Sequence, residues 1–157
     1  MSFTLHSSAF TEGERLPYRH MAEGGNVSPE LLWYGWPAGV QSFALVMHDP
    51  DAPEGDFTHW LLWDIPASSS SLSEGAGTTP GGATGRNSFG EILYHGPAPP
   101  PGDGPHRYYF ALYALAAPRL GLPSGSERKE FDEAVKFHLV DTARLMVLCG
   151  RPVVPAV

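Results

Sequence analysis

The residues of this chain best suited to chemistry stand at the ends of apolar runs. An acidic turn, "DPDAP" (49–53), ends one run, and His59 and His106 each stand at the start of another. A carboxylate can accept a hydrogen bond from an imidazole and fix its tautomer, and an imidazole can donate to an anionic oxygen. If these ends meet, Asp49, the two imidazoles and the phenol of Tyr108 form a small site. A phosphate or carboxylate group is a natural ligand for it.

Each of these residues could also have a purely structural role. Asp and Pro are typical of turns that end strands, and a single His at a strand end is more often a surface residue than a catalytic one. Two His and one Asp also match a metal site. The "HRY" (106–108) and "DPDAP" contexts favour an anion pocket instead, so we expect no metal and no cofactor.

The elements that must position this site are predicted to be mainly strands. The runs at 42–47, 59–65 and 107–115 are almost continuously apolar and end at Pro, Gly, Asp or Ser, which is typical of strands buried on both faces. The segments at 67–85 and 96–105 are rich in Ser, Gly and Pro, which predicts loops. Shorter strand candidates are "FTLH" (3–6), "LLWYGW" (31–36) and "EILYHG" (91–96).

One late segment has the periodicity of a helix. From Phe131 to Cys149 the apolar residues recur three and four apart, Ser126 could cap the start, and Gly150 would end it. We therefore predict a helix over 127–148. Many strands, one amphipathic helix and abundant loops together indicate a β-sandwich or partly closed sheet with a helix packed on it.

The bulk composition narrows the class of protein. The 157 residues fit a single domain (1–157), and 18 Gly and 16 Pro argue against a helical bundle. A net charge of -7 disfavours binding to DNA, RNA or anionic bilayers. The chain has one cysteine, no evident signal peptide and no apolar run of the ~20 residues that span a membrane. We expect a soluble cytoplasmic protein without stable membrane insertion.

Two long segments resemble one known family. "GGNVSPELLWYGWPAGVQSFALVMHDPDAPEGDFTHWLLWDIPA" (24–67) and "GRNSFGEILYHGPAPPPGDGPHRYYFALYAL" (85–115) are similar to the motif blocks of the phosphatidylethanolamine-binding proteins, also called Raf kinase inhibitor-like proteins. The second block contains G-x-N-x-x-G, G-P-x-P-P and H-R-Y in that order. The resemblance is to the bacterial branch and covers nearly the whole chain. It implies an antiparallel Greek-key β-sandwich with a C-terminal α-helix.

The resemblance also assigns a small anion pocket at one end of the strands. A cis peptide bond between Ala52 and Pro53 is another family feature that it implies. The pocket residues that it implies are Asp49 as the carboxylate, His59 and His106 as the histidines, Tyr108 as a wall, and Ala98 and Pro100 from the proline loop.

This chain departs from the family pattern at several positions. His48 replaces the usual Asp and His95 is an extra imidazole, and we expect both to be solvated residues at the rim of the pocket. Ala98 is small, as is usual there. Cys149 stands where a Tyr is common, which leaves the C-terminal wall of the pocket undefined. We interpret Cys149 as a buried small apolar residue, because nothing near it in sequence would lower its pKa.

The function that follows is binding of a small anionic ligand of the phosphate or phospholipid-headgroup type. The family resemblance adds modulation of a kinase or protease. The alternative is a small-molecule enzyme, an isomerase or cyclase of specialised metabolism, with Asp49, His59 and His106 in acid–base roles. Imidazoles near a pKa of ~6.5 should strengthen anion binding as the pH falls from about 8 to 6. The oligomeric state stays open, and a homodimer is compatible with the sequence.

Overall fold

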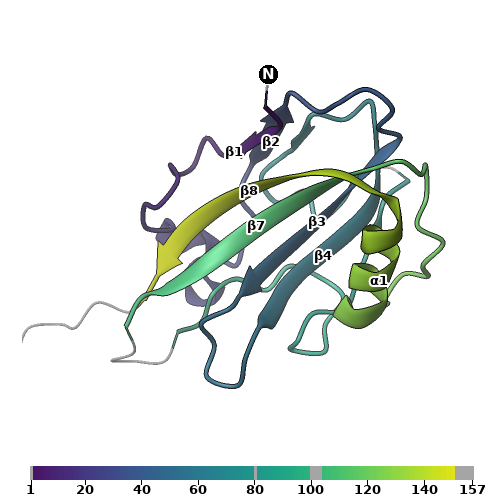
Figure 1. Ribbon diagram of the computed structural model, residues 1–157. Coiled ribbons are helices and arrows are strands. Elements are labelled where there is room, and N and C mark those ends of the chain that lie inside the picture. The colour runs from purple at the N-terminus through teal and green to yellow at the C-terminus, as the bar shows by residue number, and fades with distance from the viewer. Residues whose placement is uncertain (1, 80, 100–103, 151–157) are drawn as a thin grey trace, which may run out of the picture.

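The computed structural model describes residues 2–79, 81–99 and 104–150, which form two antiparallel sheets and one α-helix. The smaller sheet has the strand order β1 (Thr4–His6), β2 (Leu31–Tyr34) and β5 (Ser71–Leu72). The larger sheet has the order β6 (Ala83–Thr84), β4 (Phe57–Pro66), β3 (Ser42–Asp49), β7 (His106–Leu115) and β8 (Leu139–Cys149) (Figure 1). The helix α1 spans Arg128–His138, and two short 3-10 helices are η1 (Tyr18–His20) and η2 (Ala22–Gly24). The predicted mostly-β fold with a helix near the C-terminus is confirmed.

The three long apolar runs are the centre of the larger sheet, and they are buried on both faces as predicted. One face of β3, β4 and β7 packs toward the smaller sheet and forms the larger core. The other face packs against α1 and forms a second core, and Figure 1 shows the helix lying against the sheet. This two-sided burial explains why these runs are continuously apolar rather than alternating. The second core consists of Ala44, Val46, Leu61, Trp63, Ala111, Leu115, Phe131 and Val135.

The predicted helix over 127–148 is correct only in its first half. The α-helix ends at His138, and the next residue starts β8, which runs from Leu139 to Cys149. From Ala143 onward alternate residues of β8 are buried, which is the period of a strand. Several of the apolar positions in this stretch fit both periods. Pairing with β7 along nearly its whole length decides for the strand.

The outer edge of β8 is covered by the N-terminal segment. The backbone N–H of Gly13 donates to the carbonyl of Met146 at 2.8 Å, and that of Leu16 donates to the carbonyl of Leu148 at 2.9 Å. The backbone N–H of Met146 donates to Glu12 Oε2 at 2.7 Å. Cover of this kind satisfies the free polar groups of an edge strand.

Four smaller predictions are wrong. The segment 91–96 is not a strand, whereas the predicted loop 67–85 contains the two short strands β5 and β6. The peptide bond between Ala52 and Pro53 is trans. Ser126 is not the cap of α1; Glu127 precedes the helix, and Ser126 Oγ donates to the carbonyl of Pro123. Within the described residues, no helix is long and apolar enough to cross a membrane.

Candidate functional site

Antiparallel pairing brings the predicted site residues to one edge of the larger sheet. β3 lies between β4 and β7, and the end of β3 is therefore next to the start of both neighbours. Four buried side chains come from these ends, and we call them the Asp–His cluster. They are Asp49 at the end of β3, His59 near the start of β4, and His106 and Tyr108 at the start of β7, with 3%, 3%, 9% and 2% of their surface exposed.

Asp49 and His106 form a buried pair. His106 Nδ1 donates to Asp49 Oδ2 at 2.7 Å, and Asp49 Oδ1 accepts from the backbone N–H of Asp51 at 2.8 Å. The carboxylate therefore fixes the proton of His106 on Nδ1. The ring of His106 also stacks on that of Tyr108, with centroids 6.4 Å apart. Both groups of the pair are oriented by the fold before any ligand arrives.

His59 is held differently. Its Nδ1 donates to the backbone carbonyl of His95 at 2.7 Å, and its ring contacts Tyr108 at a centroid distance of 5.3 Å. Burial lowers the pKa of His59 to about 4, and this outweighs the opposing effects of the His95 carbonyl and the Asp49 charge. At neutral pH His59 is therefore a neutral imidazole whose Nε2 accepts hydrogen bonds.

This result corrects the expected pH dependence. The sequence analysis assigns both histidines a pKa near ~6.5 and a gain of charge as the pH falls from about 8 to 6. His59, with a pKa of about 4, stays neutral over that range. The burial of the ring, which the sequence does not show, sets this neutral state against the opposing effect of the His95 carbonyl.

Two phenylalanine rings also contact the ring of His59. Phe57 and Phe89 lie 5.3 and 5.5 Å from it between ring centroids, and Phe89 stacks on His95 at 3.5 Å. The sequence analysis missed Phe89, although it lies inside the G-x-N-x-x-G segment at 85–90. These rings contribute to the apolar surroundings that keep His59 neutral.

The buried side chain of Asn87 holds the loop that carries Phe89. Its Oδ1 accepts from the backbone N–H groups of Phe89 and Glu91 at 2.9 and 3.0 Å, and its Nδ2 donates to the carbonyl of Leu93 at 2.9 Å. The Asn of the G-x-N-x-x-G motif thus has a structural role beside the cluster, because it fixes the turn.

The second acid of the turn, Asp51, serves a different residue. Its carboxylate accepts from Arg107 through Nε, Nη2 and the backbone N–H, at 2.9, 2.8 and 2.9 Å. The hydrogen bonds from Arg107 lower the pKa of Asp51 to about 2. Since Asp51 also donates its own N–H to Asp49, this ion pair anchors the turn that carries the cluster. The sequence analysis did not identify Arg107.

Other predicted residues lie outside the cluster. His48 contacts Asp56 and the ring of Tyr109 instead, so it is not at the rim of this site. Ala98 is an exposed loop residue. Pro100 lies outside the described residues. The pocket-lining roles of Ala98 and Pro100 stay predictions.

Cys149 lies beside the cluster. Cys149 is buried directly opposite His106 in the pairing of β7 and β8. Burial raises the pKa of the thiol to about 11, as expected for an unreactive residue. The described part of the chain contains no group of three or more His, Cys, Asp or Glu side chains that could hold a metal ion.

Comparison with known proteins gives consistent matches. A family model described as phosphatidylethanolamine-binding protein matches residues 6–150. A UPF0098 protein of Aquifex aeolicus is 40% identical over 150 residues, which cover 94% of this chain and 88% of that protein. The UPF0098 protein YbhB of Escherichia coli is 35% identical over 155 residues, covering 92% and 98%. The crystal structure of E. coli YbcL, described as a member of the mammalian PEBP family, matches with a TM-score of 0.89 at 34% identity, covering 94% of this chain and 98% of that one.

Proposed function

Because this chain belongs to the phosphatidylethanolamine-binding protein family, we propose that its Asp–His cluster binds a small oxyanion, such as phosphate or a phospholipid headgroup. The single observation that supports this most is the use of Nδ1 in both imidazoles. Nδ1 of His59 is committed to a carbonyl and Nδ1 of His106 to a carboxylate. A ligand that enters the cluster would therefore meet Nε2 of His59 beside the buried Asp49–His106 pair.

The two imidazoles offer a phosphate different groups. Neutral His59 accepts a hydrogen bond through Nε2. His106 offers positive charge when it is protonated, and the Asp49 carboxylate stabilises that charged form. A monoprotonated phosphate carries one O–H to donate and several oxygens that accept, so it complements both rings. Asp49 would then support anion binding through His106, although it is itself an anion.

A protein partner would use the same chemistry. The family resemblance implies modulation of a kinase or protease. In this proposal the cluster would bind a phosphorylated or acidic group of that partner.

The second candidate function is acid–base catalysis, and the Asp49–His106 pair is the observation that favours it. A carboxylate that orients an imidazole is a common arrangement for a general base. His59 is a poor candidate for that role, because a base with a pKa of about 4 is too weak near neutral pH. The enzyme alternative therefore rests on His106 alone, and we favour binding.

Calorimetric titration with inorganic phosphate and with phosphoethanolamine tests the proposal. We expect saturable binding that weakens by about tenfold or more in His106→Gln and in Asp49→Asn, since a charged hydrogen bond is lost or left unsupported. Arg119→Gln, which changes an exposed arginine elsewhere, should bind as the wild type does. Equal affinity for the two ligands would point to the phosphate group alone, and tighter binding of phosphoethanolamine to a headgroup.

Two results would count against the binding proposal. Unchanged affinity in both cluster variants would place the ligand elsewhere. Turnover of a carbonyl or enol substrate that disappears in Asp49→Asn, with the fold intact, would support the enzyme instead.

A further inference from the structure

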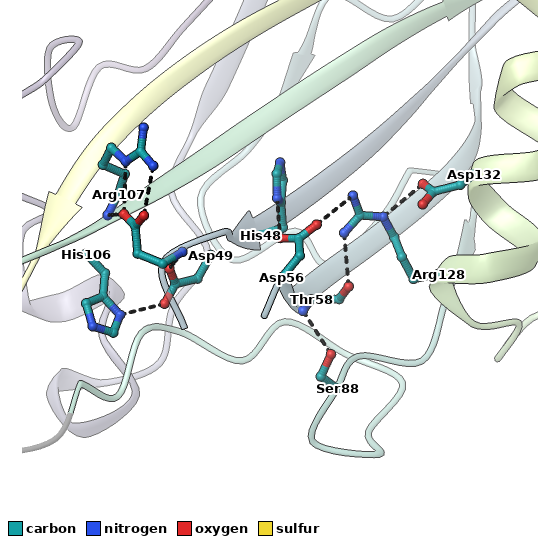
Figure 2. A network of polar contacts seen from close by, with 10 residues as sticks. His48, Asp49, Asp56, Thr58, Ser88, His106, Arg107, Arg128 and Asp132 are labelled. Carbon is teal, nitrogen blue, oxygen red and sulfur yellow. Dashed lines mark hydrogen bonds and ion pairs between the residues drawn. The ribbon is translucent and has the colours of Figure 1, made fainter. Parts of the chain in front are cut away.

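A second concave site lies on the other face of the larger sheet. It has a volume of about 560 Å³, and we call it the arginine groove. Its walls include His48, Arg107, Tyr109, Tyr113, Arg128 and Arg144. The groove and the Asp–His cluster are formed by the same strands on opposite faces of the sheet, because neighbouring residues of a strand point to opposite faces. Figure 2 shows His106 and Arg107 on opposite sides of β7.

The wall of the groove is rich in arginine in a protein that is acidic overall. Three of the ten Lys and Arg residues of the chain line it, although the net charge is -7. No acidic side chain is among the described residues that line it. A concave surface with this concentration of guanidinium groups favours an anionic ligand.

Two of the three guanidinium groups are already partnered by carboxylates. Arg107 is held by Asp51, as described above. Arg128 contacts Asp56 at 3.3 Å and Asp132 at 2.8 Å, and Asp56 also accepts from His48 Nδ1 at 2.7 Å (Figure 2). Arg107 and Arg128 are therefore fixed in place and cannot easily rearrange.

Arg144 differs from the other two. Its side chain is exposed, and within the described residues its guanidinium makes no hydrogen bond and no ion pair. It pairs with Ala111 across β7 and β8, so the two side chains leave the sheet on the same face. Tyr109 and Tyr113 flank Ala111 on that face, two residues away on either side. Arg144 thus enters the groove beside the gap between two tyrosines.

The tyrosines add neutral donors to this charged wall. The phenol of Tyr113 lines the same groove as Arg128 and Arg144. The Tyr109 hydroxyl accepts from Arg107 Nη1 at 3.4 Å and keeps its own proton to donate. Phenol and guanidinium donors at one wall suit a ligand with several anionic oxygens.

We propose that the arginine groove binds a compact polyanion of the polycarboxylate or diphosphate type, with Arg144 and Tyr113 as its principal contacts. The volume supports a ligand larger than one inorganic ion, because small-molecule sites occupy roughly 300–1,000 Å³. Arg107 and Arg128 keep their carboxylate partners, which offset their charge, so Arg144 supplies the uncompensated positive charge of the groove. This site is separate from the Asp–His cluster and does not depend on the function proposed for it.

Calorimetric titration with citrate and with inorganic pyrophosphate tests this proposal on the full chain. Both should bind more tightly than acetate. Arg144→Gln should weaken binding by about tenfold or more, and Tyr113→Phe should weaken it by a smaller factor. Arg119→Gln is the matched control for an exposed arginine and should not change the affinity for citrate. His106→Gln distinguishes the two sites, because it should affect only binding in the Asp–His cluster and leave the binding that depends on Arg144 in place.

The first three results below would overturn the assignment, and the last would refine it. If neither probe binds, or if Arg144→Gln binds them as the wild type does, the groove is not the site. Equal losses in Arg144→Gln and Arg119→Gln would show unspecific attraction to surface charge. Loss in His106→Gln but not in Arg144→Gln would assign the polyanion to the cluster. A preference between citrate and pyrophosphate would separate carboxylate from phosphate ligands.

Discussion

The acidic turn after β3 serves two sites through alternate residues. Asp49 turns into the buried cluster and orients His106, whereas Asp51 holds Arg107, which lines the arginine groove. His48, the residue before Asp49, belongs to the groove as well. A five-residue motif thus fixes a buried imidazole on one face of the sheet and a guanidinium on the other.

At the scale of residues, the pKa of His59 predicts a dependence of stability on pH. Its value of about 4 in the folded protein lies below the ~6.5 of an unfolded chain, so the unfolded state binds more protons between these values. The contribution is fully present above about pH 6.5 and is lost as the pH falls toward 4. The loss amounts to about 3 kcal/mol.

Urea unfolding of the wild type and His59→Gln at several pH values between 6.5 and 4 measures this effect. The free energy of unfolding of the wild type should fall more steeply with decreasing pH than that of the variant. A constant offset between the two proteins does not matter, because only the difference in slope reports the titration of His59. Parallel profiles would show that the imidazole is not held neutral by burial.

Single residues of the cluster could be predicted, but their protonation states could not. Asp49, His59, His106 and Tyr108 stand at run ends that can be found in the sequence, and the structure brings them into contact. The neutral state of His59 depends on burial, and its tautomer depends on a carbonyl 36 residues away; neither has a sequence signal. The orientation of His48 could have been inferred, because it is the neighbour of Asp49 in a strand.

At the scale of elements, the sequence predicts the central strands well and the C-terminal part poorly. β3, β4 and β7 are long apolar runs with clear boundaries, and such runs are typical of strands that are buried on both faces. The stretch after His138 contains apolar residues at both two-residue and three-to-four-residue spacing. Its structure is decided by pairing with β7, a contact distant along the chain, which local periodicity does not report.

The helix itself should depend on one aromatic residue. Phe131 is fully buried and contacts the rings of Trp63 and Tyr113. Phe131→Ala should lower the free energy of unfolding by about 3–5 kcal/mol, because it leaves a cavity between α1 and the sheet. Phe137 is the matched control, since it lies on the same helix with 85% of its surface exposed.

Chemical denaturation of the two variants checks this prediction. Phe137→Ala should stay within about 0.5 kcal/mol of the wild type, as is usual for exposed positions. Similar losses in both variants would mean that the second core does not hold α1 in place.

At the scale of the whole molecule, one sheet has a different polar site on each face. The cluster is buried and built from imidazoles and one carboxylate, and the groove is open and built from guanidinium and phenol groups. We propose both as anion sites, although the net charge of -7 repels anions at long range. Affinity in either site must therefore come from local hydrogen bonds and ion pairs.

Added salt should weaken binding in the exposed groove more than in the buried cluster, because salt screens exposed charges more strongly than buried ones.

The most direct test of the central claim is an NMR titration with phosphate that follows the ring nitrogens of His59 and His106. We predict that both rings shift together, with one dissociation constant, and that His59 stays in the neutral form with its proton on Nδ1 between pH 8 and 6. Asp49→Asn should weaken the response of both rings. Histidine signals that do not move while phosphate binds, or that move only at His48, would contradict the assignment of the Asp–His cluster as the anion site.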